Sequence, residues 1–265
     1  LNLGKKLNIG VFESVIFSNS DSLSNNSFQL EYLNPIIFYR AIEQQNGSPD
    51  NVLLGADFKW LLTKKVMIYG QWVFDEFLLD NLKEGTGWWG NKWAAQLGAE
   101  YVDAFGVQNL DLQGEFNISR PYTYSHDTQF GSYSNYRQSL AHPLGANFRE
   151  VIGIVRYQPL NRLMITGKLI ITEYGEDAPD DNFGKNILLP NNTREMEFGN
   201  DIGQGIASDL SFADLTVSYQ WKHNFFIDIK HIYRQLESEQ ADLTRETNFT
   251  SLVLRWNIPQ RLNEF

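Results

Sequence analysis

The feature that most constrains this chain is an alternation of apolar and polar residues with a period of two. In 108–118, the apolar residues Leu110, Leu112 and Phe116 alternate with acidic and amide side chains. Successive side chains of a strand point to opposite faces, whereas a helix would scatter these charges around its circumference. The segment therefore predicts a β-strand with one apolar face and one polar face.

The same alternation recurs along the whole chain, with less regularity in four of the segments. Each segment has about the ten residues that a tilted strand needs to cross a bilayer. We expect a single domain over residues 1–265 with ten antiparallel strands: 5–17, 51–62, 65–77, 91–103, 107–118, 146–158, 162–174, 208–221, 224–236 and 246–258.

The connections between these segments alternate between short and long. Only two residues, 63–64, separate one pair of strands, whereas the polar stretches 18–50, 119–145 and 175–207 separate others. Short periplasmic turns and long extracellular loops are typical of outer-membrane barrels. Residues 28–39 are apolar, but an extra crossing there would break the alternation. We therefore expect them inside the first loop, where they could form a plug.

Aromatic residues support a membrane location for this all-β, antiparallel fold. The chain has 7 Trp, 12 Tyr and 18 Phe, yet no apolar run reaches the roughly 20 residues of a membrane helix. Amphipathic rings gather at the two membrane interfaces. We place Trp60, Tyr101, Trp221 and Trp256 at the periplasmic interface and Phe74, Trp93 and Tyr233 at the outer one. A soluble β-sandwich, which also alternates, is the alternative.

Charge and composition exclude several functions. The net charge is −10, so nucleic acid is not an expected partner, and the absence of Cys excludes thiolate chemistry. The polar face carries both signs of charge, which predicts a cross-linked and closed lumen. Its expected residues are Asp57, Lys59, Gln96, Glu100, Asp111, Gln113, Glu115, Asn117, Lys168, Asp214, Asp228, Lys230, Arg234 and Arg255.

No catalytic motif is evident, and we expect neither an enzyme nor a cofactor. None of the four histidines, His126, His142, His223 and His231, has metal-ligand spacing to another. No metal is expected. An acidic run in the loop 175–207 offers carboxylates that Ca²⁺ could use, although such a loop is more often simply solvated. This weak candidate consists of Glu176, Asp177, Asp180 and Asp181.

Aromatic residues in the long loops are the best binding candidates. Aromatic faces stack on sugar rings, and neighbouring polar groups bind the hydroxyls. The candidate glycan-binding residues are Trp88, Trp89, Tyr122, Tyr124 and His126. The alternative is that these rings belong to the outer aromatic belt or pack the loops together.

Three stretches carry a family resemblance: LNPIIFYRAIEQQNGSPDN at 33–51, RPYTYSH at 120–126 and LAHPLGANF at 140–148. They resemble the Wzi-like capsule-assembly outer-membrane proteins of the Bacteroidetes, a family that includes the gliding-motility protein RemB. The resemblance implies a barrel of about eighteen strands. We therefore interpret the ten strands as the C-terminal part of a larger barrel. The lack of a signal segment favours the same interpretation, and a complete ten-stranded barrel is the alternative.

Together these features predict a non-enzymatic barrel in the bacterial outer membrane, with its long loops outside and its C-terminus in the periplasm. Binding or organising capsular polysaccharide is the first functional hypothesis. An accessory barrel of a motility or secretion complex and a diffusion porin are the alternatives. The expected partners are membrane lipid, lipopolysaccharide, capsular polysaccharide and other outer-membrane proteins.

Overall fold

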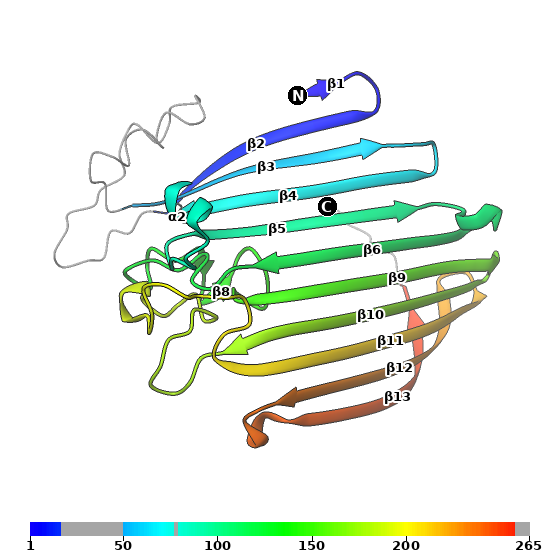
Figure 1. The fold of residues 1–265 in the computed structure, drawn as a ribbon. Coiled ribbons are helices and arrows are strands. Elements are labelled where there is room, and N and C mark those ends of the chain that lie inside the picture. Colours follow the sequence, from blue (N-terminus) through cyan, green and yellow to red (C-terminus); the bar gives the residue numbers. More distant parts are fainter. Residues whose placement is uncertain (17–49, 77–78, 258–265) are drawn as a thin grey trace, which may run out of the picture.

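The computed structural model describes residues 1–16, 50–76 and 79–257, and these form one large antiparallel sheet (Figure 1). Eleven strands follow one another in chain order, so every neighbour pair is antiparallel. The strands are β1 (Asn2–Leu3), β2 (Leu7–Ile16), β3 (Asn51–Leu61), β4 (Val66–Glu76), β5 (Lys92–Tyr101), β6 (Leu110–Ser119), β9 (Phe148–Leu160), β10 (Leu163–Glu176), β11 (Ile206–Lys222), β12 (Phe225–Ser238) and β13 (Arg245–Trp256). The predicted all-β antiparallel class is confirmed.

Each of the ten predicted segments corresponds to one strand, with boundaries shifted by up to three residues, and the two-residue β1 adds an edge that the sequence did not indicate. β11 begins at Ile206, two residues before the predicted segment, because it stays paired with β10 as far as Glu176. The expected plug at 28–39 lies outside the described residues. The short pieces β7 (Ser134–Asn135) and β8 (Gln138–Ser139) form a small hairpin within the loop 120–147.

The two ends of the sheet differ, as the connections predict. In Figure 1 the short turns lie at one end, called here the turn end, and the long connections lie at the other, the loop end. At the turn end, Asn109 and Asn224 adopt left-handed backbone conformations, which asparagine tolerates better than most residues. The Asp103 carboxylate accepts a hydrogen bond from the Asn109 amide at 2.9 Å and closes the β5–β6 turn. This bond, together with Lys65, lowers the pKa of Asp103.

The strand registers give the sheet one apolar face and one polar face. Leu97, Phe116, Val151 and Ile171 are paired across four consecutive strands, so they form a single row on the apolar face. They are exposed, with Leu97 at 54%. Similar residues extend the face along β9 and β10 and over β11 to β13: Val155, Leu169, Leu215, Ile229, Leu252 and Leu254. An exposed apolar area of this extent marks an interaction surface.

Aromatic residues lie on the apolar face near both ends of the strands. Trp60, Tyr101, Trp221 and Trp256 occupy the last two positions of their strands at the turn end. Toward the loop end, the ring centroid of Trp72 lies 5.8 Å from Phe74 and 5.2 Å from Trp93. Trp93 and Tyr101 are eight positions apart on β5, which is about 27 Å along a strand. Aromatic residues therefore lie at both ends of the apolar band and are called here the two aromatic belts; the loop-end belt consists of the rings on β4 and β5.

The polar face is held together by pairs between neighbouring strands. Tyr69, Gly98 and Glu115 stand in one cross-strand row, and the Tyr69 ring passes over Gly98, which has no side chain to obstruct it. The Tyr69 hydroxyl then donates to Glu115 at 2.7 Å. Farther along, the Lys230–Asp214 distance is 2.7 Å and the Arg255–Asp228 distance is 2.9 Å.

All fourteen residues expected on the polar face share that face in the registers of β3 to β13. Neighbouring charges of opposite sign compensate each other there. The polar face also carries residues that are not among these fourteen. One of them is Arg156, which donates to Gln113 at 3.2 Å.

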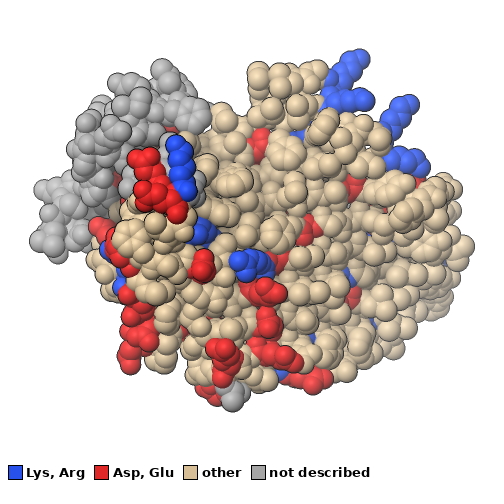
Figure 2. All heavy atoms as spheres, in the orientation of Figure 1, with Lys and Arg blue, Asp and Glu red and all other residues tan. Residues whose placement is uncertain are grey.

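Charge is distributed unevenly between the two ends (Figure 2). Exposed basic residues gather at the short turns: Lys5, Lys6, Lys64, Arg162 and Lys222. Exposed acidic residues gather in the loops at the other end: Asp80, Asp180, Asp181, Glu195, Asp201, Glu239 and Asp242. The only α-helix in the described ranges, α2 (Leu79–Glu84), has six residues, and no described helix is long and apolar enough to cross a membrane.

Candidate functional site

The long loops at the loop end pack against one another and form a cap over the strand ends. Backbone amides of Trp89, Gly199 and Asn200 donate across the contact between loops 79–91 and 177–205, at 2.8–3.1 Å. The Asn200 side chain is fully buried and donates to the carbonyls of Gly87 and Met196. These bonds resemble a short ladder, so the two loops form one ordered surface.

The third loop, 120–147, joins the same assembly. The Tyr122 amide donates to Gly184 at 2.8 Å, and the Asn191 amide donates to His126 at 2.8 Å. Asn147 has a left-handed backbone and a fully buried side chain. Its amide bridges the ends of β10 and the loop before β11, with contacts to Gly175 and Gln204 at 3.0 and 2.8 Å. The cap is therefore fixed by main-chain and asparagine contacts between loops distant in sequence.

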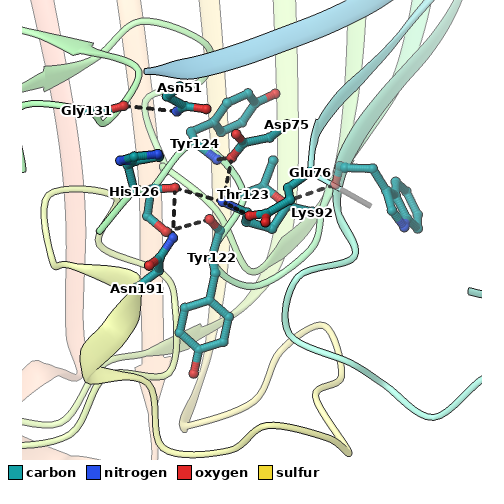
Figure 3. Close-up of polar contacts among 12 residues, drawn as sticks. Asn51, Asp75, Glu76, Lys92, Tyr122, Thr123, Tyr124, His126, Gly131 and Asn191 are labelled. Atoms are coloured by element: carbon teal, nitrogen blue, oxygen red, sulfur yellow. Dashed lines mark hydrogen bonds and ion pairs between the residues drawn. The ribbon is translucent and has the colours of Figure 1, made fainter. Parts of the chain in front are cut away.

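A buried ion pair anchors the cap to the sheet (Figure 3). The side chains of Asp75 on β4 and Lys92 on β5 are almost fully buried, with Lys92 Nζ 3.5 Å from Asp75 and 3.1 Å from Glu76. Lys92 also donates to the Ser125 carbonyl at 3.0 Å, and Asp75 accepts the Tyr124 amide at 2.7 Å. Both ends of the pair therefore hold the turn 122–126, which offsets part of the cost of burying two charges.

Two of the five candidate glycan-binding residues form an accessible cluster. The indole N–H groups of Trp88 and Trp89 both donate to the Glu197 carboxylate, at 3.2 and 3.0 Å. The Arg194 guanidinium stacks on Trp89 at 4.2 Å from the ring centroid and also pairs with Glu197. The bonds from Arg194 first, and then from the two indoles, lower the pKa of Glu197.

Two exposed apolar residues of the 177–205 loop are the sequence neighbours of Glu197. Met196 and Phe198 flank Glu197 and are exposed, and the backbone contact at Trp89–Glu197 brings the two loops together. We call Trp88, Trp89, Met196 and Phe198, together with Arg194 and Glu197, the aromatic patch. It combines ring faces with one carboxylate and one guanidinium, which is the composition that recognises a polar ligand with an apolar face.

The other three candidates are placed differently. Tyr122 is 1% exposed and donates its hydroxyl to the Asn182 carbonyl at 2.8 Å, and burial raises its pKa to about 12. Tyr124 is buried in an apolar cluster with Leu53, and burial raises its pKa as well. His126 is half-buried beside Asp127. Both tyrosines are buried and pack the loops of the cap together, so neither ring is exposed on the outer surface of the cap.

The acidic run is used within its own loop. Both carboxylate oxygens of Asp177 accept backbone amides, from Phe183 and Asn186 at 2.7 Å and from Lys185 at 3.3 Å. Glu176 pairs with Lys185 at 2.9 Å, while Asp180 and Asp181 are exposed. Across the described ranges, no three His, Asp or Glu side chains are grouped so that they could hold a metal ion.

Four residues of the cap were not indicated by the sequence: Asp75, Lys92, Arg194 and Glu197. Asp75 and Lys92 continue the polar face of β4 and β5, so their side of the sheet was predictable, but their burial depends on a loop far away in the chain. Arg194 and Glu197 have i,i+3 spacing in a loop without periodicity, and only the fold brings them to Trp88 and Trp89.

Comparison with known proteins adds no relative. No family model, curated protein or solved structure matches the chain. The functional argument therefore rests on the geometry of the sheet and the cap.

Proposed function

We propose that the sheet of this chain forms part of the wall of a bacterial outer-membrane β-barrel and that its loops form a cap outside the cell. We further propose that the cap binds exported polysaccharide. The observation that carries the proposal is the apolar band of the sheet, bounded by an aromatic belt at each end and covered by ordered loops at one end only. In a bilayer, an apolar face of this kind contacts lipid and the belts lie at the interfaces.

The proposed orientation follows from the length of the connections. Outer-membrane barrels have short turns in the periplasm and long loops at the cell surface. An open sheet edge has no hydrogen-bond partners in lipid, so the sheet must be closed there. We propose closure by further strands, as in the larger barrel that the family resemblance implies, with the described strands as its C-terminal part.

Recognition is assigned to the aromatic patch because loops on a rigid scaffold are where barrels place binding groups. The rings of Trp88 and Phe198 can cover the apolar side of a sugar ring, while Glu197 and Arg194, which is stacked on Trp89, can bind hydroxyl groups. The scaffold is rigid here, since the backbone contacts between the two loops fix the patch. The Wzi-like resemblance supports capsular polysaccharide as the exported glycan.

The first test concerns the membrane. Purified protein is expected to stay folded only in detergent or lipid, and to be recovered in the outer-membrane fraction of cells. A monomeric, cooperatively folded protein in detergent-free buffer would contradict the barrel.

The second test concerns the patch. Replacing Trp88 and Trp89 together by Ala should reduce retention of capsular polysaccharide on cells. Replacement by Phe should retain more of it, because one aromatic ring is kept at each position although the indole N–H and the second ring are lost. Tyr136→Ala is the matched control, since Tyr136 is a more exposed loop aromatic outside the patch. Unchanged retention in the Ala variant, with the barrel assembled, would exclude these rings as the glycan site.

The two alternatives give different results. The loop 120–147 folds against the polar face, where His142 lies within 3.1 Å of Glu150 on β9, and this placement disfavours a porin. A large, steady conductance in planar bilayers would favour the porin. The exposed Met196 and Phe198 could equally contact a protein, so intact capsule retention with lost partner copurification in the Trp variants would favour the accessory barrel.

A further inference from the structure

A cavity of about 290 Å³ lies on the polar face at the loop end, between the sheet and the loop 120–147. The sheet contributes side chains from β2 to β6 and from the start of β9, and the loop covers them with Tyr124, Tyr133 and His142. It is separate from the aromatic patch, because none of the patch residues lines it. Its size is near the lower limit for ligand pockets, which is roughly 300 Å³, so it suits one small ring.

The lining of the cavity is uncharged. Elsewhere the polar face carries many charged pairs, yet among the described residues no Lys, Arg, Asp or Glu lines this cavity. A charged ligand would lose its hydration there without an opposite charge to replace it. The lining therefore selects against ions and in favour of a neutral molecule.

Amide groups form a row on one wall of the cavity. Gln71 is paired with Gln96, and Gln96 with Asn117, on three adjacent strands of one face. Neither Gln71 nor Gln96 has a side-chain hydrogen bond to another described residue, so each offers a donor and an acceptor. Both N–H groups of Asn117 are used, by Glu115 at 2.9 Å and Glu150 at 3.0 Å, which leaves its carbonyl oxygen as an acceptor.

Aromatic rings from the loop and from the start of β9 line the rest of the cavity. Tyr124 and Tyr133 lie with their centroids 6.0 Å apart and their planes at 30°, and Phe148 stacks under His142 at 4.4 Å. The His142 ring is oriented by two bonds, with Nδ1 accepting the Leu144 amide and Nε2 at 3.1 Å from Glu150. The rings are therefore held in place by the loop and do not depend on a ligand for their positions.

We infer that this cavity binds a single neutral sugar ring, with hydroxyl groups on the amide row and the apolar side of the ring against the aromatic wall. Amides can both donate to and accept from hydroxyl groups, and the lining offers no charged group to pair with the carboxylate of a uronic acid or the ammonium group of an unacetylated amino sugar. The inference depends on the proposed function only for the origin of the sugar, which is either a free monosaccharide or the end of an exported chain.

The test is direct binding to the purified full chain, measured by saturation-transfer NMR and calorimetry. The detergent should be an amine oxide or a phosphocholine, since glycosidic detergents carry competing sugar rings. The probes are the methyl glycosides of glucose, galactose and N-acetylglucosamine, with glucuronate and glucosamine as charged comparators. We expect dissociation constants on the order of 1–10 mM for at least one neutral probe, and at least about tenfold weaker binding of the charged ones.

Two variants test the amide row. Gln71→Leu and Gln96→Leu should each weaken binding by about fivefold, as expected for the loss of one hydrogen bond. Gln220→Leu makes the same chemical change on the same face of β11, outside the cavity, and should bind as the unaltered protein does. The comparison of neutral with charged probes uses the unaltered protein, so it is decisive even if a variant fails to fold.

The inference is overturned if no neutral probe binds up to about 100 mM, or if charged sugars bind as well as neutral ones. Variants with unchanged affinity would overturn it too. A trisaccharide that binds as tightly as its monosaccharide would identify a chain end as the ligand, and exclusion of the trisaccharide would identify the free sugar. Capsule retention tests the aromatic patch, whereas binding of the sugar probes tests the cavity. The proposed function and the inference about the cavity can therefore fail independently.

Discussion

Leu97 on β5 is the position where placement in a membrane can be tested most directly. It lies midway between Trp93 and Tyr101 of the two aromatic belts, so it is about 13 Å from each along the strand. Its neighbours in the row, Phe116 and Val151, are also exposed and apolar. In a bilayer bounded by these belts, Leu97 would face the middle of the hydrocarbon region.

Replacing Leu97 by Arg should therefore cost about 2–4 kcal/mol, the range for an arginine facing lipid at the midplane. Leu112 on β6 is the matched comparison, because it is on the same face but pairs with Tyr101 of the turn-end belt. There the same substitution should cost only about 0–1 kcal/mol. The expected difference between the two variants is roughly 2–3 kcal/mol.

The assay is reversible folding into lipid vesicles, with the free energy of unfolding taken from denaturant titrations. Leu97→Ala controls for loss of the side chain alone. In a water-soluble sheet, an exposed Leu→Arg change should stay within about 0.5 kcal/mol of neutral at both sites. Equal, small costs at Leu97 and Leu112 would therefore refute the membrane placement.

Three further outcomes are expected. An epitope tag inserted at Tyr136, which is 93% exposed, should be reachable on intact cells, whereas a tag at the buried Asn191 should disrupt the cap; labelling of the Tyr136 tag only after lysis would reverse the orientation. Lys92→Ala should cost about 3–5 kcal/mol, because it leaves Asp75 buried without its partner, and a denaturant midpoint near that of the unaltered protein would contradict the anchor. Since the folded pKa of Glu197 is below its ordinary value of 4.5, its contribution is complete above that pH and is lost as pH falls through the folded pKa. The midpoint difference between the unaltered protein and Glu197→Gln should thus shrink below about pH 4.5, and a constant difference would argue against it.

The strands and their two faces could be predicted because each depends on local sequence alone. A period of two specifies which residues share a face, and the register then follows from burying or exposing that face consistently. The level of a residue between the two aromatic belts was harder to predict from the sequence. The alternation put Leu112 and Phe116 on one face, but only the pairing of Leu112 with Tyr101 shows that Leu112 is level with the aromatic belt.

The cap could not be predicted to the same degree because loops have no periodicity. Trp88 and Tyr122 looked equivalent in the sequence as aromatic loop residues. The fold leaves Trp88 accessible and buries Tyr122, whose hydroxyl reaches a carbonyl 60 positions away. The contacts that decide this, such as Asn200 with Gly87, join segments more than 100 positions apart. Nothing in either segment alone indicates its partner.

The uneven distribution of charge between the two ends sets the conditions under which a polymer can approach the loops. Carboxylates crowd the loop end, and their summed field extends about 8–10 Å into physiological saline. An anionic polymer arriving from that side is slowed by repulsion, whereas a neutral chain is not. Raising the ionic strength should therefore accelerate capture of anionic chains and leave neutral chains unaffected. In this way the molecule would sort its encounters by charge before any side chain touches the arriving polymer.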